Sequence, residues 1–172
     1  MNSDVLPDGG GWLARLVEAH DALPEAGAVG PKLLFDDGSI QHAGFEFRRD
    51  PGSGGWELAE VCKGLHRDFA PANERRATPA LSGACLLTDL ELYRDLEGLS
   101  VDYVKGGYED ADLCMRIQER GLETWYIPEV ELYHLEGRSY VPKENDMSRR
   151  FNPWLFGQRW GGRIESDPGE ET

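Results

Sequence analysis

Three short segments of the sequence carry side chains that could bind a metal ion or move a proton. One contains Asp4, close to the amino terminus, and a second contains His134. The third follows a pair of glycines and contains Glu109, Asp110 and Asp112. Carboxylates and imidazoles are ligands of divalent cations, and a fixed carboxylate can accept the proton of a hydroxyl group. The residue types therefore indicate metal-assisted chemistry with a carboxylate base.

Each segment also has a structural explanation. Asp4 is of a type that favours turns and helix caps. Acids at a helix start complement the helix dipole, and Asp112 stands four residues before Arg116, the spacing of an intrahelical ion pair. His134 ends a predicted strand, where it is either a ligand or a strand-end residue. Taken singly, none of the three segments decides between structure and function.

Charge is distributed unevenly along the chain. Residues 89–136 contain 13 acids against 4 bases, whereas residues 138–163 contain 6 bases against 2 acids. Such neighbouring stretches could bind a cation and an anionic group side by side, or could be solvated faces of an acidic protein. With 18 basic and 32 acidic residues, the net charge of -14 has the wrong sign for binding nucleic acid through the overall field.

Length and composition favour one folded domain. The chain has 172 residues, of which 40% are hydrophobic, and its apolar stretches are too short to span a membrane. The first residues show no signal for export, so we expect a cytoplasmic protein, with peripheral placement at the inner face of the membrane left open. The cysteines, Cys62, Cys85 and Cys114, are odd in number and widely spaced, which favours reduced, packed thiols.

Hydrophobic spacing predicts the elements that must position these residues. It indicates helices over 12–20, 90–96 and 110–121, the second capped by Asp89, and a helical region over 147–156. Asp36-Asp37-Gly38-Ser39 predicts a hairpin of strands 28–35 and 40–47. We expect a long loop over 48–79 and short strands at 84–88, 124–127 and 131–135, the last two separated by Pro128.

In this order the motifs resemble the carboxyl-terminal half of the catalytic domain of family 2 glycosyltransferases, inverting enzymes of GT-A fold. The segment Glu-Asp-x-Asp-Leu-Cys-x-Arg at 109–116 is the most specific match. Further matching segments cover nearly the whole chain, at 2–5, 11–13, 29–33, 37–44, 82–87, 134 and 156–161. For residues 1–164 the resemblance implies an α/β fold: a partial GT-A-like mixed sheet with flanking helices that lacks the amino-terminal nucleotide-binding strands. An acidic, disordered tail is expected at 165–172.

The resemblance also implies roles for the site residues. Asp4 and His134 would hold a divalent cation, manganese or magnesium, that bridges the diphosphate of a nucleotide-sugar donor. Asp110 would be the general base, and Glu109 would position it or the acceptor. The other residues implied in binding are Gly83, Trp12, Asp112 and Arg116 for the acceptor or substrate, and Arg138 and Ser139 for the diphosphate.

Three departures from the family pattern refine this interpretation. Asn2 is uncharged where the family usually has an acid. Gln158-Arg159-Trp160 lacks the two residues that separate Gln from Arg in processive synthases, which implies a non-processive enzyme. The chain also begins at the metal motif, without the strands that hold the nucleotide in the family. We therefore expect the isolated chain to be inactive, to bind nucleotide sugars weakly, and to self-associate through an exposed sheet edge.

The predicted reaction is metal-assisted, inverting transfer of a sugar from a nucleotide-diphosphate donor to a hydroxyl group of a glycan or lipid-linked acceptor. No nucleic acid partner and no integral membrane segment are expected. Two alternatives come from other classes. One is a non-catalytic carbohydrate-binding or interaction module derived from a glycosyltransferase, and the other is a metal-dependent hydrolase that uses Asp4, Asp110 and His134.

Overall fold

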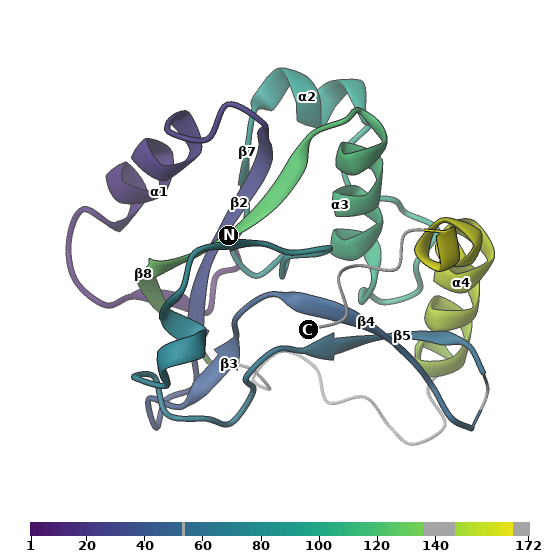
Figure 1. The fold of residues 1–172 in the computed structure, drawn as a ribbon, viewed down its shortest axis with the longest axis horizontal. Coiled ribbons are helices and arrows are strands. Elements are labelled where there is room, and N and C mark those ends of the chain that lie inside the picture. Colours follow the sequence, from purple (N-terminus) through teal and green to yellow (C-terminus); the bar gives the residue numbers. More distant parts are fainter. Residues whose placement is uncertain (53, 136–146, 167–172) are drawn as a thin grey trace.

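The computed structural model describes residues 1–52, 54–135 and 147–166. A mixed six-stranded sheet is flanked by helices, and a two-stranded sheet lies beside it (Figure 1). The predicted α/β class is therefore confirmed. The elements in chain order are β1 (Val5–Pro7), α1 (Trp12–Asp21), β2 (Ala26–Leu34), β3 (Ile40–His42), β4 (Phe45–Arg49), β5 (Trp56–Glu60), the 3-10 helix η1 (Ala70–Asn73), β6 (Arg76–Ala77), β7 (Leu87–Thr88), α2 (Leu90–Asp95), α3 (Glu109–Glu119), β8 (Glu123–His134) and α4 (Ser148–Ser166).

The two long strands β2 and β8 pair in parallel and form the centre of the main sheet. Short antiparallel strands pair with their outer edges: β1 and β6 with β8, and β3 and β7 with β2. Every residue of β2 is buried, which explains its nearly continuous apolar sequence. Gly27 lets α3 approach this strand, because a Cβ at this position would lie 2.3 Å from Cγ2 of Ile117.

Apolar clusters cover both faces of the sheet. Val29 and Leu33 of β2 belong to one cluster with Leu16 of α1. Leu34 belongs to the other, together with Ile117 of α3 and residues of α4. Figure 1 shows α1 and α3 on opposite sides of the central strands. The main sheet is thus shielded by α1 on one face and by α3 on the other, and α4 packs against α3 and β5.

The predicted hairpin is correct only in its first half. β3 pairs with β2 around the Asp-Gly turn, but Gly44, at φ +90°, separates β3 from β4. β4 then pairs along its whole length with β5, which lies inside the segment predicted to be a loop. That prediction was wrong over residues 48–49, 56–60, 70–73 and 76–77. The chain reverses between β4 and β5, where the amide of Asp50 donates to the carbonyl of Gly55 at 2.9 Å.

Two other boundaries differ from the predictions, since the strand expected over 84–88 is confined to β7 and the last strand is undivided. Pro128 does not divide the last strand: β8 is continuous, and its pairing with β2 shifts register between Pro31 and Lys32. Such an irregularity accommodates a residue that cannot donate a hydrogen bond. The predicted cap of α2 is confirmed, since Asp89 Oδ1 accepts hydrogen bonds from two amides of the first turn. Glu165 and Ser166 end α4, and residues 167–172 of the predicted tail lie outside the described residues.

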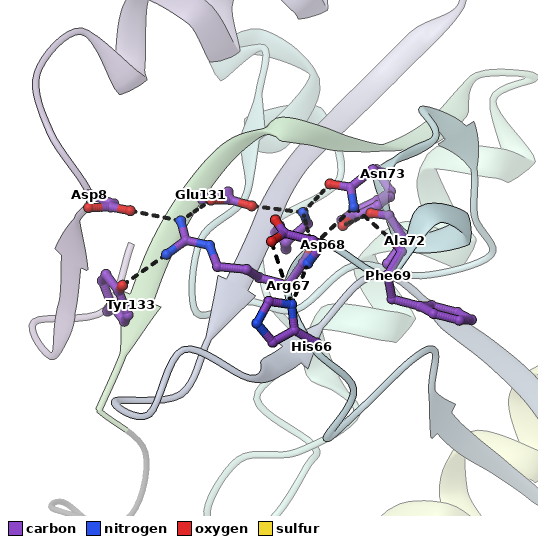
Figure 2. Close-up of polar contacts among 11 residues, drawn as sticks. Asp8, His66, Arg67, Asp68, Phe69, Ala72, Asn73, Glu131 and Tyr133 are labelled. Carbon is purple, nitrogen blue, oxygen red and sulfur yellow. Dashed lines mark hydrogen bonds and ion pairs between the residues drawn. The ribbon is translucent and has the colours of Figure 1, made fainter.

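A buried lysine ties the segment before η1 to the sheet. Lys32 of β2 is fully buried, and its ammonium group donates to Glu131 Oε1 at 2.8 Å and to Asn73 Oδ1 at 2.6 Å. Figure 2 shows the guanidinium group of Arg67 on the other side of Glu131, where it also contacts Asp8 at 2.8 Å. Each charged side chain of this network therefore contacts a side chain of opposite charge, as buried charges require.

Candidate functional site

β1 and β8 bring Asp4 and His134 together from opposite ends of the sequence. The strands are antiparallel with Val5 opposite His134, and the amide of Leu135 donates to the carbonyl of Asp4 at 3.0 Å. As a result, Asp4 Oδ1 lies 3.5 Å from His134 Nε2. Both side chains are partly exposed, so a carboxylate and an imidazole can contact one ligand.

Gln41 of β3 orients the ring of His134. Its Oε1 lies 2.7 Å from His134 Nδ1, and its Nε2 donates to the main-chain carbonyl of His134 at 3.2 Å. Because the NH₂ group faces a carbonyl, the oxygen faces the ring, and an amide oxygen only accepts hydrogen bonds. Nδ1 therefore carries a proton, which leaves Nε2, on the side of Asp4, as the ring nitrogen that can bind a metal ion.

Replacement of Gln41 by leucine should release His134 from this tautomer. We expect the unprotonated ring to be nearly pure Nδ1–H tautomer in the unaltered chain and a mixture of both tautomers in Gln41→Leu, since no acceptor then faces Nδ1. Long-range ¹H–¹⁵N NMR spectra of the imidazole distinguish the two forms. The exposed His66 supplies a reference signal that should not change. An unchanged tautomer of His134 would contradict the orienting role of Gln41.

Residues 82–84 connect the segment that carries Asp4 with the start of α3. The amide of Gly83 donates to Asp110 Oδ2 at 2.8 Å, and the carbonyl of Ala84 accepts from the amide of Asn2 at 2.7 Å. A Cβ at Gly83 would lie 3.1 Å from the Cβ of Asp110, so the close approach favours glycine. Asp110 and Asn2 thus contact the main chain of two consecutive residues, Gly83 and Ala84.

His42, the neighbour of Gln41 in β3, holds this segment from the other side. Its Nε2 accepts a hydrogen bond from the amide of Ser82 at 3.1 Å, and its Nδ1 lies 2.7 Å from Glu60 Oε2. A ring nitrogen that accepts from an amide is unprotonated, so buried His42 is neutral and donates from Nδ1 to the carboxylate. Two consecutive residues of β3 therefore order both halves of the site.

The carboxyl groups at the start of α3 lie in a partly desolvated environment. Burial raises the pKa of Asp110, although hydrogen bonds from the amides of Gly83 and Ala111 oppose this shift. Burial also raises the pKa of Glu109, and the charge of Asp110 adds to the shift. Glu109 Oε2 is buried and has no hydrogen-bond partner among the described residues. Neighbouring carboxyl groups with raised pKa values suit proton transfer.

Asp112 and Arg116, predicted to contact substrate, lie in an interior network. Asp112 is buried, and it accepts from Tyr103 at 3.1 Å and from Trp160 of α4 at 2.9 Å. Arg116 donates to Asp112 at 2.8 Å and to the carbonyl of Gly98 at 2.8 Å. These contacts join α3 to α4 and to the segment after α2, and the predicted binding role of the two residues stays a prediction.

Of the other predicted binding residues, Trp12, Arg138 and Ser139, the structure describes only Trp12. Trp12 begins α1 and packs against the apolar cluster that contains Val5 and Leu16. Arg138 and Ser139, predicted to contact the diphosphate, lie outside the described residues. All three roles stay predictions.

Asp4 and His134 fit a divalent cation as a pair of ligands. Across residues 1–52, 54–135 and 147–166, no group of three or more His, Cys, Asp and Glu side chains could hold a metal ion. Two protein ligands, one oxygen and one nitrogen, suit manganese or magnesium when substrate oxygens or water complete the coordination. The chemistry of the donor pair therefore agrees with an ion shared between protein and substrate.

Gln41, His42 and Ser82 were not predicted as site residues. The only signal available was their position inside the matching segments 37–44 and 82–87. Their importance depends on the contacts of Gln41 with His134 and of His42 with Glu60 and Ser82, which no local pattern indicates.

Comparison with known proteins identifies several relatives, although no family model matches the chain. The uncharacterized protein y4gI of Sinorhizobium fredii is 30% identical over 173 residues, which is 98% of this chain and 19% of that protein. The O-antigen biosynthesis protein RfbC of Myxococcus xanthus is 30% identical over 141 residues, 81% of this chain and 11% of RfbC. The N-acetylglucosaminyl-diphospho-decaprenol L-rhamnosyltransferase of Mycobacterium tuberculosis is 28% identical over 147 residues, 76% and 44% of the two chains.

The names of the last two relatives point, at modest identity, to a glycosyltransferase family and to polysaccharide biosynthesis. The chain spans less than half of the length of each of these relatives. None of the helices in the described ranges combines the length and the hydropathy needed to cross a membrane.

Proposed function

We propose that this chain forms the metal- and acceptor-binding part of a metal-assisted, inverting glycosyltransferase of family 2 and GT-A fold. One observation carries the proposal: the Asp4–His134 pair and the Asp110 carboxylate, far apart in sequence, are joined through residues 82–84. The names of the relatives support sugar transfer as the chemistry.

The geometry supports a single-displacement reaction. A manganese or magnesium ion bound by Asp4 and His134 would stabilise the charge that develops on the leaving diphosphate. Asp110 accepts the proton of the acceptor hydroxyl while that oxygen attacks the anomeric carbon. The new carbon–oxygen bond forms as the bond to the diphosphate oxygen breaks, which inverts the anomeric centre. Glu109, directly beside Asp110, contacts the acceptor or keeps the base in place.

The substrates proposed are a nucleotide-diphosphate sugar and a glycan or lipid-linked acceptor. The name of the mycobacterial relative, an N-acetylglucosaminyl-diphospho-decaprenol L-rhamnosyltransferase, supports this class of substrates. We also propose that the transfer is non-processive and that the protein lies at the inner face of the membrane. Self-association and inactivity of the isolated chain stay predictions.

Manganese binding to this chain tests the metal site. We expect Asp4→Ala and His134→Ala each to weaken Mn²⁺ binding by about tenfold or more, because each removes one of two protein ligands. Calorimetry and the Mn²⁺ electron paramagnetic resonance signal measure the affinity. The matched control is the exposed pair His66 and Asp68, whose ring nitrogen and carboxylate lie 3.6 Å apart. Equal losses in His66→Ala and His134→Ala would contradict the site.

Sugar transfer is tested in a chimera in which this chain replaces the matching segment of the mycobacterial relative. The same two ligand variants should raise the Mn²⁺ concentration needed for transfer and leave the rate at saturating Mn²⁺ less affected. A chimera that folds and binds Mn²⁺ and acceptor glycan but transfers no sugar would favour the non-catalytic binding module.

A further inference from the structure

Four consecutive residues before α3 have left-handed backbone conformations. The φ angles are 57° for Lys105, 84° for Gly106, 93° for Gly107 and 79° for Tyr108. Glycine adopts such angles readily, whereas Lys105 and Tyr108 are strained there and need surrounding contacts to hold them. Strained backbone of this kind is found near functional sites, and this run ends directly before Glu109.

The side chain of Asn152, from α4, holds this segment. Asn152 is buried, and its Oδ1 accepts from the amide of Val104 at 2.9 Å. Its Nδ2 donates to the carbonyls of Val104 at 3.1 Å, of Gly106 at 3.0 Å and of Gly107 at 3.0 Å. One side chain thus bonds four main-chain groups of a segment more than forty residues earlier in the sequence.

α4 continues this contact along the start of α3. Phe156, one turn after Asn152, packs on Tyr108 with ring centroids 5.3 Å apart. Trp160, one further turn along, donates to Asp112 at 2.9 Å. Residues at a spacing of four lie on one face of a helix, so a single buried face of α4 contacts residues 104–112 in order.

We propose that Asn152 is a positioning residue for Asp110: by bonding the main chain of residues 104–107, it fixes the left-handed segment 105–108 and sets the start of α3 so that Asp110 meets the amide of Gly83. The proposal rests on the proposed function only in treating Asp110 as the base. The mechanical coupling between Asn152 and the contact of Asp110 with Gly83 is a property of this chain alone.

Asn152→Asp is the sharpest test, because it is isosteric and keeps the acceptor for Val104. It replaces the donor by an oxygen that faces three carbonyl oxygens. We expect the amide of Gly83 to exchange with solvent about tenfold faster or more, beyond any change shared with the rest of the sheet, the scale expected when a buried group loses its partner. The NMR titration of Asp110 should also move toward the ordinary aspartate range, because its environment becomes more hydrated.

Three further variants make the result interpretable. Asn152→Ala introduces no charge and should show the same two changes if Asn152→Asp does not fold. Gln158→Glu makes the same chemical change on an exposed face of α4 and should leave Gly83 and Asp110 unchanged. Tyr126→Phe removes a buried hydrogen bond of 2.9 Å to the carbonyl of Ala72, so it destabilises the fold without touching residues 104–107.

If Asn152 only stabilises the fold, Tyr126→Phe and Asn152→Ala should speed the amide exchange of Gly83 equally when they lower the free energy of unfolding equally. That result, or unchanged exchange and titration in both Asn152 variants, would overturn the proposal. These measurements need no sugar transfer. If the chimera shows no dependence on Asp110, the proposed function fails while the coupling between Asn152 and Gly83 is still measured.

Discussion

Asp110→Asn in the chimera should lower the rate of sugar transfer by about 100-fold or more, the scale of a positioned general base. Asparagine has nearly the same shape, but its amide cannot take the proton of the acceptor hydroxyl. The structure adds a detail to this expectation. Asp110 accepts from Gly83 through Oδ2 and from Ala111 through Oδ1, both at 2.8 Å, and asparagine can satisfy only one of these amides. Initial rates at saturating substrates measure the loss, with thermal unfolding recorded in parallel.

Asp89→Asn is the matched control for this change. Asp89 also begins a helix and accepts hydrogen bonds from two amides, but through one oxygen, Oδ1, which asparagine retains. We expect transfer in Asp89→Asn to stay near the rate of the unaltered chimera. If Asp110→Asn keeps normal turnover while Glu109→Gln abolishes it, the base is Glu109. If all three variants are active, Asp110 only stabilises the helix start.

The pH dependence of the transfer rate in the same chimera shows whether Asp110→Asn removes a base or only displaces the segment before α3. A general base acts when it is deprotonated, so the rate should fall as the pH drops through its pKa. Because burial raises the pKa of Asp110, this fall should occur above the ordinary aspartate value of about 3.9. In Asp110→Asn the low residual rate should lack this acidic limb.

The sequence pattern predicted those elements whose formation depends mainly on residues close together in the chain. Asp89 before a short apolar run predicted the cap of α2, and the spacing of residues 12–20 predicted α1. The break at Gly44 was missed because the alternation of apolar residues continues through it, and only the pairing of β4 with β5 shows that the chain leaves the main sheet. Pairing across the sequence is decided by packing of distant segments, which a local pattern does not contain.

The candidate site was predictable to a similar extent. The types of Asp4, Asp110 and His134 indicated their chemistry, but their proximity depends on the register of β1 with β8 and on the contacts of residues 82–84. Nothing in the sequence indicated the role of Asn152, since asparagine has a low helix propensity and the following Pro153 disfavours a helix interior. Its four bonds to residues 104–107 exist only once α4 has packed. Buried polar residues of this kind are recognised by their partners rather than by their neighbours in the sequence.

Glu131→Gln should cause a large loss of stability, about 3 kcal/mol in the free energy of unfolding, within the range for breaking a buried ion pair. Lys32 is fully buried, and without the carboxylate its ammonium group has only neutral acceptors: the oxygens of Asn73 and of the Arg67 carbonyl, at 2.6 Å and 3.2 Å, and the amide oxygen introduced at position 131. Arg67, shown beside Glu131 in Figure 2, would keep Asp8 as its acidic partner. Urea unfolding of this chain at neutral pH measures the loss.

Glu129→Gln supplies the matched control on the same strand. Glu129 pairs with Arg75 at 2.8 Å, but both side chains are solvent-exposed, so we expect a loss below about 1 kcal/mol. Similar losses in the two variants would show that burial of Lys32 does not decide the cost. A loss below about 1 kcal/mol in Glu131→Gln would contradict the stabilising role of the Lys32–Glu131 ion pair.

The same carboxylate should make part of the stability depend on pH. Burial acts to raise the pKa of Glu131, but hydrogen bonds and charge from Lys32 and Arg67 outweigh it, so the pKa in the folded chain is lowered. A lowered pKa means that the contribution is fully present above the unfolded value of about 4.3 and is lost as the pH falls through the folded value. The difference in stability between the unaltered chain and Glu131→Gln should therefore shrink on acidification below pH of about 4.3, whereas a difference that stays constant would place its origin in packing rather than in charge.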